Sequence, residues 1–398
     1  MPGTPFAFLY PLILILLLGA CQQLDYYPPK EAEGGWRTTS NHAFIRSLQL
    51  LPDKLAELGE YGLSVKSSEV SSVLVIKDGW LVGEWYSAPQ GKTTRMYVAS
   101  VGKSFATICF GIAEQDSRTG TIPYQLSKKS NVYDRRWLPM GFPLSDPRKK
   151  EITFDHIFRQ TSGITPENST VEKTRPIEMG RNQWDDYVAW VVGHDPAWPQ
   201  TARLFFPPGR PELYPGHARW GEHRGAYSSV GYAHIGLVLA ELYQMPAHQF
   251  LETRLLEPLG FSGIDYEEPP APPHVKWFSA GGLHMTPRDF ARFAYLLLRE
   301  GRWRQQQLVA KQWLQEMTST PFYENLRSNS DGYLGQHYPP DLLRLFGSGG
   351  NFAFIVPSHD LIVLKTGRID NLFLERHMHD FLRRTFLMIP GYAVDRAR

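Results

Sequence analysis

The chain has 398 residues, of which 42% are hydrophobic and 21% are charged, which excludes a disordered, fibrous or coiled-coil protein. Lys and Arg (42) nearly balance Asp and Glu (40), and a net charge of +2 without a long basic run predicts no nucleic-acid partner. The two cysteines, Cys21 and Cys109, are too few for a disulfide framework or a structural zinc site, and no metal or other cofactor is expected.

The N-terminus carries an apolar run at residues 6–20, which is shorter than the roughly 20 residues that span a bilayer and matches a secretory signal. It ends in Leu18-Gly19-Ala20-Cys21, which resembles a bacterial lipobox, where the signal is cut before a cysteine that receives lipid. A plain secretory signal and a short membrane anchor are the alternatives. The lipobox predicts a protein of the bacterial cell envelope, held to a membrane by lipidated Cys21 and facing the periplasm or the exterior. The predicted divisions are a signal at 1–20, a tether at 21–40 and one folded unit at 41–398.

Hydrophobic spacing indicates the first elements of the folded unit. A helix is expected over 41–58, and Asp78-Gly79 between apolar runs predicts a hairpin over 73–82. Residues from 104 to about 273 have mostly helical patterns, broken by loops rich in Pro and Gly. Cys109 lies on an apolar helical stretch there, where a buried and inert thiol is expected.

The last third of the chain returns to strands. A helix is predicted over 287–299, and two alternating runs at 351–356 and 361–366 flank a turn at 357–360. An amphipathic helix over 372–386 ends the chain. Strands from both ends of the chain, with helices inserted between them, predict a discontinuous α+β fold.

Ser100-Val101-Gly102-Lys103 is the only Ser-x-x-Lys in the chain, and a helical run follows it. Residues three apart share a helix face, so the Lys103 amine is expected beside the Ser100 hydroxyl, whose proton a neutral amine can take. Ser100 as a helix N-cap is the alternative. A lysine in the first turn opposes the helix dipole and Gly102 lowers helix propensity, and such departures from local rules are typical of functional sites.

Two later clusters carry polar groups next to predicted elements. Tyr227-Ser228-Ser229 precedes an apolar helix, where a serine cap and a core tyrosine are the alternative interpretation. Gly347-Ser348-Gly349-Gly350-Asn351 opens a strand. Glycines at that place allow close approach of a backbone or a ligand, and a hairpin corner would need them equally.

In order and spacing, these residues resemble the serine β-lactamase and penicillin-binding-protein superfamily, specifically its class C β-lactamase, D,D-peptidase and esterase branch, which includes 6-aminohexanoate-dimer hydrolases. The resemblance implies a β-lactamase/transpeptidase-like fold of the α+β class. Such a fold has an antiparallel sheet flanked by N- and C-terminal helices, and an inserted all-helical subdomain at about 104–273. The motifs Ser-x-x-Lys, Tyr-x-Asn and His/Lys-x-Gly match Ser100–Lys103, Tyr227–Ser229 and Ser348–Gly350, with supporting segments at 153–163 and 280–289.

The resemblance also implies a function, that of a serine hydrolase acting on an ester or amide through an acyl-enzyme. The substrate would be a small-molecule ester or amide or a cell-wall peptide. A penicillin-binding-like lipoprotein that acylates slowly, and senses or binds a cell-wall fragment, is the alternative. The resemblance implies Ser100 as nucleophile, with Lys103 and Tyr227 as general acid and base. The backbone N–H groups of Ser100 and Asn351 would donate hydrogen bonds to the oxyanion. Ser229 would orient Lys103 and the substrate, and Ser348 and Gly350 would be further positions of the substrate site.

The chain departs from the family motifs at two positions. Ser229 stands in place of Asn and has less reach to a substrate amide, and Ser348 stands in place of a Lys or His that helps hold a carboxylate. These departures favour an esterase or amidase for neutral acyl groups over a β-lactamase or D,D-carboxypeptidase. Lys365-Thr366-Gly367 imitates the third motif, but pairing across the predicted turn sets Lys365 opposite Phe352, so the match is interpreted as a coincidence.

Overall fold

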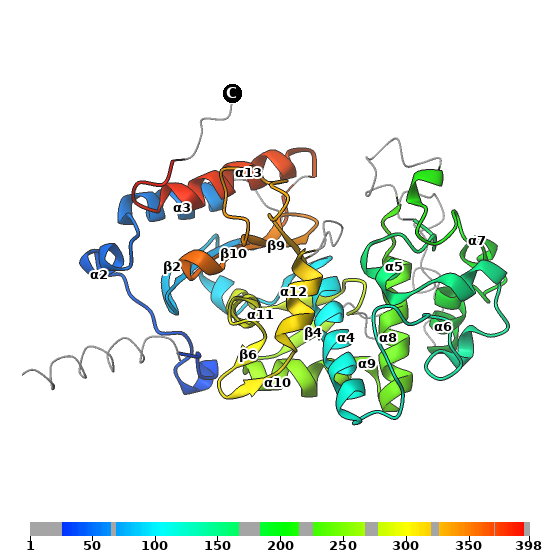
Figure 1. Cartoon of the computed structure of the whole chain (residues 1–398). Coiled ribbons are helices and arrows are strands. Elements are labelled where there is room, and N and C mark those ends of the chain that lie inside the picture. Colours follow the sequence, from blue (N-terminus) through cyan, green and yellow to red (C-terminus); the bar gives the residue numbers. More distant parts are fainter. Residues whose placement is uncertain are drawn as a thin grey trace, which may run out of the picture.

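The computed structural model describes residues 26–64, 69–166, 184–214, 226–266, 278–319, 326–369 and 371–393. Its centre is a six-stranded antiparallel sheet in the order β2-β1-β11-β10-β9-β8, in which β1, near the start of the chain, pairs with β11, near its end (Figure 1). The predicted α+β fold with strands from both ends is confirmed. The strands are β1 (Ser72–Lys77), β2 (Trp80–Tyr86), β8 (Leu326–Ser328), β9 (Leu343–Gly347), β10 (Asn351–Val356) and β11 (Leu361–Thr366).

Two hairpins of this sheet follow the sequence prediction closely. Asp78 and Gly79 join β1 to β2 with φ of +51° and +74°, the left-handed conformation that a two-residue hairpin turn requires. The turn at 357–360 joins β10 to β11, and Phe352 pairs with Lys365 as predicted. Two further small sheets contain β3 (Met96–Tyr97), β5 (Leu283–Met285) and β4 (Ile264–Tyr266), and β6 (Arg302–Trp303) with β7 (Gln306–Gln307).

The two faces of the large sheet are covered by different helices. On one face, α3 (Pro52–Ser64) and α13 (Asn371–Leu387) pack on side chains such as Val363, and on the other, α4 (Val101–Thr119) and α11 (Pro287–Leu298) pack on side chains such as Leu364 (Figure 1). This alternation is the period of two that a strand imposes.

The helix predicted over 41–58 is two helices, α2 (His42–Ser47) and α3. The chain leaves α2 through Gln49, which has a φ of +61°, and Pro52 opens α3. Proline lacks a backbone N–H donor, so it begins a helix readily and does not continue one. The single-helix prediction was therefore wrong at this break.

Between β3 and β4 the described residues form helices and loops, apart from a single bridge between Asn131 and Thr153. Figure 1 shows α5 to α8 gathered to one side of the sheet. The apolar helix α4 is buried along nearly all of its length, and Cys109 on it is fully buried, as predicted. None of the helices in the described ranges has the length and apolar character needed to cross a bilayer. The remaining helices are α5 (Phe154–Phe158), α6 (Trp184–Val192), α7 (Pro199–Ala202), α8 (Ser229–Tyr243), α9 (Ala247–Leu251), α10 (Glu257–Leu259) and α12 (Lys311–Ser319).

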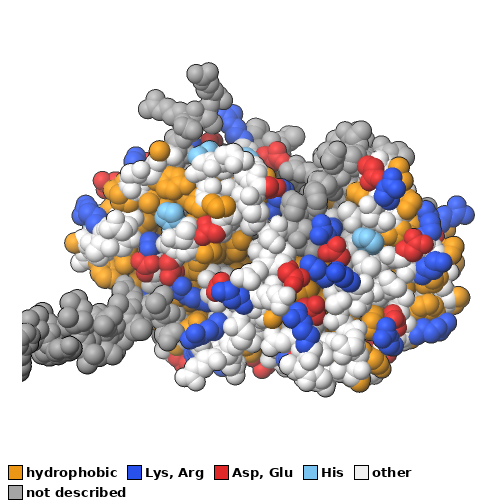
Figure 2. Space-filling view, viewed as in Figure 1, with side chains coloured by type: hydrophobic (Ala, Val, Ile, Leu, Met, Phe, Trp, Pro, Cys, Tyr) orange, Lys and Arg blue, Asp and Glu red, His pale blue; other side chains and the backbone are white. Residues whose placement is uncertain are grey.

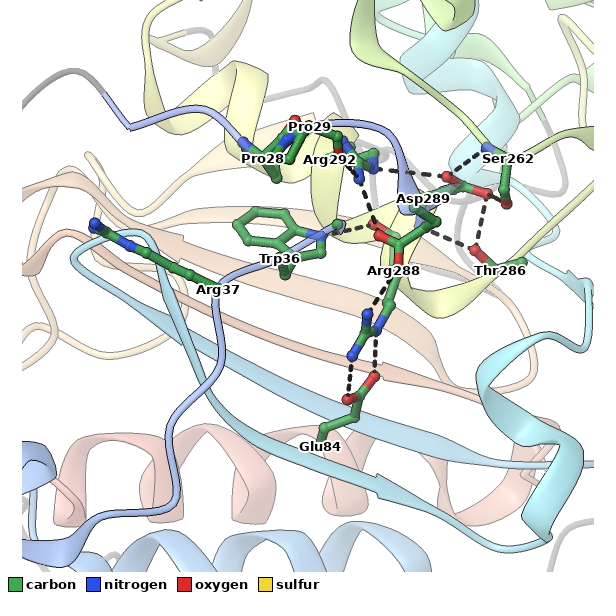
Figure 3. A network of polar contacts seen from close by, with 12 residues as sticks. Pro28, Pro29, Trp36, Arg37, Glu84, Ser262, Thr286, Arg288, Asp289 and Arg292 are labelled. Atoms are coloured by element: carbon green, nitrogen blue, oxygen red, sulfur yellow. Dashed lines mark hydrogen bonds and ion pairs between the residues drawn. The ribbon is translucent and has the colours of Figure 1, made fainter. Parts of the chain in front are cut away.

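The segment 26–37 is held against the fold by two arginines of α11 (Figure 3). Arg292 is fully buried and donates to the carbonyl oxygens of Pro28 and Pro29. Arg288 pairs with Glu31 at 2.8 Å and with Glu84 on β2 at 2.7 Å. Buried guanidinium groups need acceptors on every side, and the N-terminal segment supplies several of them.

The segment 26–37 corrects the predicted start of the folded unit. Tyr295 on α11 donates to the carbonyl oxygen of Tyr26 at 2.8 Å, so the chain is part of the fold from there and not from Asn41. The predicted tether at 21–40 is therefore too long, because spacing and composition do not reveal that prolines and polar residues serve as acceptors for a distant helix. Residues 21–25, with Cys21, lie outside the described part of the chain.

The surface carries charges of both signs. In the face seen in Figure 2, Lys and Arg side chains alternate with Asp and Glu side chains over the whole width of the molecule, without a large area of one sign. This distribution agrees with the near balance of charges in the sequence.

Candidate active site

Ser100 lies at the start of α4, directly after a sharp bend of the chain. Ala99 has a φ of +50°, which is uncommon for a residue with a side chain, and backbone strain of this kind clusters at functional sites. Ser100 occupies the N-cap position of α4, yet its side chain makes no capping hydrogen bond. Ser100 therefore lies at the N-cap position, as the alternative interpretation predicts, but its hydroxyl group does not cap the helix.

Lys103 is fully buried and gathers three oxygen atoms around its ammonium group. Its Nζ lies 3.2 Å from Ser100 Oγ, 2.9 Å from Ser229 Oγ and 2.5 Å from the carbonyl oxygen of Ala280. The predicted proximity of Ser100 and Lys103 is present. The Ala280 carbonyl was not foreseen, because it comes from a segment 177 residues away.

Gly102 explains how Ala280 reaches Lys103. A Cβ atom on Gly102 would lie 2.6 Å from the carbonyl oxygen of Phe278 and 3.0 Å from Gly281 Cα, so only glycine lets the segment 278–281 pack on the first turn of α4. The glycine that weakens the helix locally is therefore required by this close approach.

The second predicted cluster divides into a cap and a site residue. Ser228 is the N-cap of α8, and its Oγ accepts from Gly231 N at 3.0 Å. Ser229, the first helical residue, contacts Lys103 instead. The ring centroid of Tyr227 lies 4.7 Å from Lys103 Nζ, and that of Tyr232 lies 5.9 Å away. Rings at such distances attract a cation.

The contacts of Lys103 suit proton transfer from Ser100. A neutral amine has two N–H donors and one lone pair. The Ala280 carbonyl can only accept, and Ser229 Oγ can accept a second N–H, which allows the lone pair of the amine to accept the hydrogen of Ser100 Oγ. The arrangement can therefore convert Ser100 into a nucleophile when Lys103 is deprotonated.

The third predicted cluster forms the turn between β9 and β10, next to Ser100. Gly347 ends β9, and a Cβ atom there would lie 3.2 Å from Ser100 N and 2.3 Å from the carbonyl oxygen of Val98. The turn is closed by the side chain of Asn351, which donates to the Ser348 carbonyl oxygen at 2.9 Å and accepts from Gly367 N at 3.2 Å. Asn351 thus has its side chain committed to the turn, which leaves its backbone N–H as the group to consider for a substrate.

The remaining residues of the turn have different surroundings. Ser348 is exposed, and Gly350 has a φ of +90°, where a Cβ atom would lie 2.8 Å from the Ile369 side chain. The hairpin-corner explanation therefore accounts for Gly350. Arg368 packs beside Gly349, and its side chain is 70% exposed, so a cation that the sequence analysis missed lies next to the turn. Within the described ranges, the Ser100 backbone N–H donates to no acceptor, as an oxyanion donor must.

Lys365 lies on the opposite face of the sheet from Leu364, the residue that packs toward α4. Its amine is fully buried, and its hydrogen-bond acceptors among the described residues are the carbonyl oxygens of Thr366 and Gly367, at 3.4 and 3.3 Å. Burial lowers the pKa of Lys365 to about 7. The interpretation of Lys365-Thr366-Gly367 as a coincidence agrees with this placement.

We expect Lys365→Met to stabilise the protein in a pH-dependent way. The unfolded chain keeps a lysine pKa of about 10.4, so between pH 7 and 10 the folded state binds fewer protons and its stability rises with pH. The variant lacks this dependence. Its advantage should be largest below pH 7 and shrink by about 1.4 kcal/mol per pH unit above it. Denaturant unfolding at several pH values measures this difference, with Lys54→Met on the exposed side of α3 as control, and an advantage that does not change with pH would contradict it.

The described geometry defines a class of protein: an antiparallel sheet between two helical layers, with a half-buried serine beside a buried lysine at the start of the central helix. This is the β-lactamase/transpeptidase-like fold that the sequence resemblance predicted. The family model described as Beta-lactamase matches residues 65–366, and the chain belongs to this family. No curated protein matches the chain.

Solved structures share this fold at low sequence identity. A penicillin-binding-protein homologue from Caulobacter crescentus has a TM-score of 0.61 and 14% identity over 85% of this chain and 98% of its own. A putative 6-aminohexanoate-dimer hydrolase from Bacillus anthracis has a TM-score of 0.58 and 14% identity over 92% and 87%. EstCE1, a hydrolase with promiscuous acyltransferase activity, has a TM-score of 0.57 and 14% identity over 85% and 99%. At these identities the likeness is one of fold.

Proposed function

We propose that the protein is a serine hydrolase that cleaves an ester or amide through an acyl-enzyme on Ser100. The observation that carries the proposal is the contact of Lys103 Nζ with Ser100 Oγ at 3.2 Å, beside contacts of the same amine with the Ala280 carbonyl oxygen and Ser229 Oγ. Membership of the family supports it, and the structures similar to this chain include a D-stereospecific amidohydrolase and a hydrolase with promiscuous acyltransferase activity.

The reaction has two steps. Ser100 Oγ attacks the acyl carbon while Lys103 takes the hydroxyl proton, and the backbone N–H groups of Ser100 and Asn351 receive the oxyanion. The C–O or C–N bond to the leaving group then breaks, and the leaving group takes this proton, either directly from Lys103 or from Tyr227, which Lys103 then reprotonates. In the second step water attacks the acyl carbon and gives up one proton, the bond from the acyl carbon to Ser100 Oγ breaks, and the proton from water passes to Ser100 Oγ as the acid leaves.

A hydrolysis screen tests the proposed activity. It uses p-nitrophenyl esters, nitrocefin and D-Ala-D-Ala peptides, with Ser100→Ala as control. Neutral and carboxylate-bearing esters belong in the set, because the exposed Arg368 beside the turn offers a cation where Ser348 does not. Turnover of esters supports an esterase. Covalent labelling of Ser100 without turnover would instead support the slowly acylating binding protein.

We also propose that the protein is a lipoprotein of the bacterial cell envelope, attached to a membrane through Cys21. The motif Leu18-Gly19-Ala20-Cys21 supports this. Only four residues separate Cys21 from Tyr26, which bonds to α11, so an extended link spans at most about 18 Å. The folded unit would stay close to the membrane surface. Incorporation of labelled palmitate by the wild type and not by Cys21→Ser tests the attachment.

A further inference from the structure

Gln160 lies at the end of α5, in a backbone conformation that usually belongs to another residue type. The helix ends with Gln160 N donating to the Ile157 carbonyl oxygen at 3.0 Å and Thr161 N donating to that of His156 at 2.8 Å, the pattern of a Schellman motif. Gln160 has a φ of +60° in this motif, at the position where glycine is the common residue. A glutamine at this position departs from the local preference, and such departures are typical of side chains that have a role of their own.

The side chain of Gln160 reaches the turn that carries Tyr227 and Ser229. It is 3% exposed, and its Oε1 accepts a hydrogen bond of 2.8 Å from the backbone N–H of Ser228, which lies between those two site residues. A backbone N–H can only donate, so the orientation of the amide is defined. The Gln160 Nε2 group is buried and has no acceptor among the described residues. The hydrogen bond that Oε1 accepts from Ser228 N is therefore the interaction that ties this side chain to the surrounding structure.

The loop that contains Gln160 also accepts a hydrogen bond from the side chain of Ser228. Ser228 Oγ donates to the carbonyl oxygen of Thr165 at 2.7 Å and accepts from Gly231 N at 3.0 Å. Ser228 is fully buried, so its N–H would lack a partner if Gln160 were removed. The loop from Gln160 to Thr165 therefore holds Ser228 by two hydrogen bonds, one from the backbone N–H of Ser228 and one from its side-chain hydroxyl group.

We propose that Gln160 is a positioning residue for the reaction proposed above. By holding Ser228, it keeps Ser229 Oγ at 2.9 Å from Lys103 and the Tyr227 ring over the same amine. Gln160 touches none of the atoms that react. Its effect on the reaction passes through Ser228. This proposal rests on the proposed roles of Ser100 and Lys103.

Two glycine variants separate this role from helix capping. Gln244 also ends a helix, α8, with a φ of +50°, but its side chain is exposed at the other end of that helix. Glycine suits both backbone conformations, so Gln244→Gly should keep activity and thermal stability. We expect Gln160→Gly to lower kcat and the rate of Ser100 labelling by a fluorophosphonate about 10- to 100-fold, with little change in KM, because a small displacement of catalytic groups is costly.

A second pair of variants keeps the test independent of stability. Gln160→Glu keeps an oxygen that accepts from Ser228 N, whereas Gln160→Met has a similar size and no such acceptor. We expect the Glu variant to recover most of the labelling rate, and the Met variant to match Gly and to shift the pH–rate profile that reports Lys103. Equal activity of the Glu and Met variants, or a Gln160→Gly enzyme as active as Gln244→Gly, would overturn the proposal. A wild type that neither turns over substrate nor labels Ser100 would overturn the proposed function, and the role of Gln160 with it.

Discussion

Ser100→Ala is expected to lower hydrolysis on the order of 10⁴-fold or more and to abolish covalent labelling by a fluorophosphonate. The variant lacks the hydroxyl oxygen that, in the proposed reaction, attacks the acyl carbon. Its stability should stay close to that of the wild type, because Ser100 Oγ makes no capping bond to α4. Steady-state rates, intact-protein mass after labelling and thermal unfolding measure the three outcomes.

Thr107→Ala is the matched control for Ser100→Ala. Thr107 lies on α4 one turn beyond Lys103, and its buried hydroxyl group donates to the Lys103 carbonyl oxygen at 2.9 Å within the helix. Loss of this hydroxyl should leave the rate within a few-fold of the wild type. If Ser100→Ala hydrolysed the same esters as fast as Thr107→Ala, Ser100 could not be the nucleophile.

Lys103→Met is expected to lower kcat by about 10²- to 10⁴-fold, the usual contribution of a general base. Methionine has a similar length, carries no amine and fills the buried site without a polar group to desolvate. The free energy of unfolding should change little, because the cost of burying the amine is removed while the buried Ala280 carbonyl oxygen loses its donor. A large loss of activity with a small change in stability identifies a functional lysine.

Lys103→Arg separates the charge of Lys103 from its basicity. A guanidinium group keeps the positive charge but does not deprotonate near neutral pH, so it cannot take the Ser100 proton. We expect this variant to be as inactive as Lys103→Met across the accessible pH range. An arginine enzyme that kept a tenth or more of the wild-type kcat would show that Lys103 contributes charge and not proton transfer.

Local patterns were sufficient for the parts of the molecule that depend on neighbours in the chain. The hairpin at Asp78-Gly79, the pairing of Phe352 with Lys365 and the contact of Ser100 with Lys103 all follow from turn chemistry, strand period or helix period. The motif order also predicted the family. The break at Pro52 is a local signal too, and the helical spacing on both sides of it concealed it.

Tertiary structure decided which groups surround those residues. Lys103 contacts Ser229, which lies 126 positions away in the sequence, and Ala280, which lies 177 positions away. Gln160 contacts Ser228 over 68 positions, and Arg292 contacts Pro28 over 264 positions. Periodicity shows which face of an element is buried, but it does not show what that face touches. The sequence by itself therefore determined the two hairpins, the proximity of Ser100 to Lys103 and the nucleophile candidate. The partners of the amine, the contact of Gln160 with Ser228 and the contacts of residues 26–37 with α11 depended on the packing of distant segments.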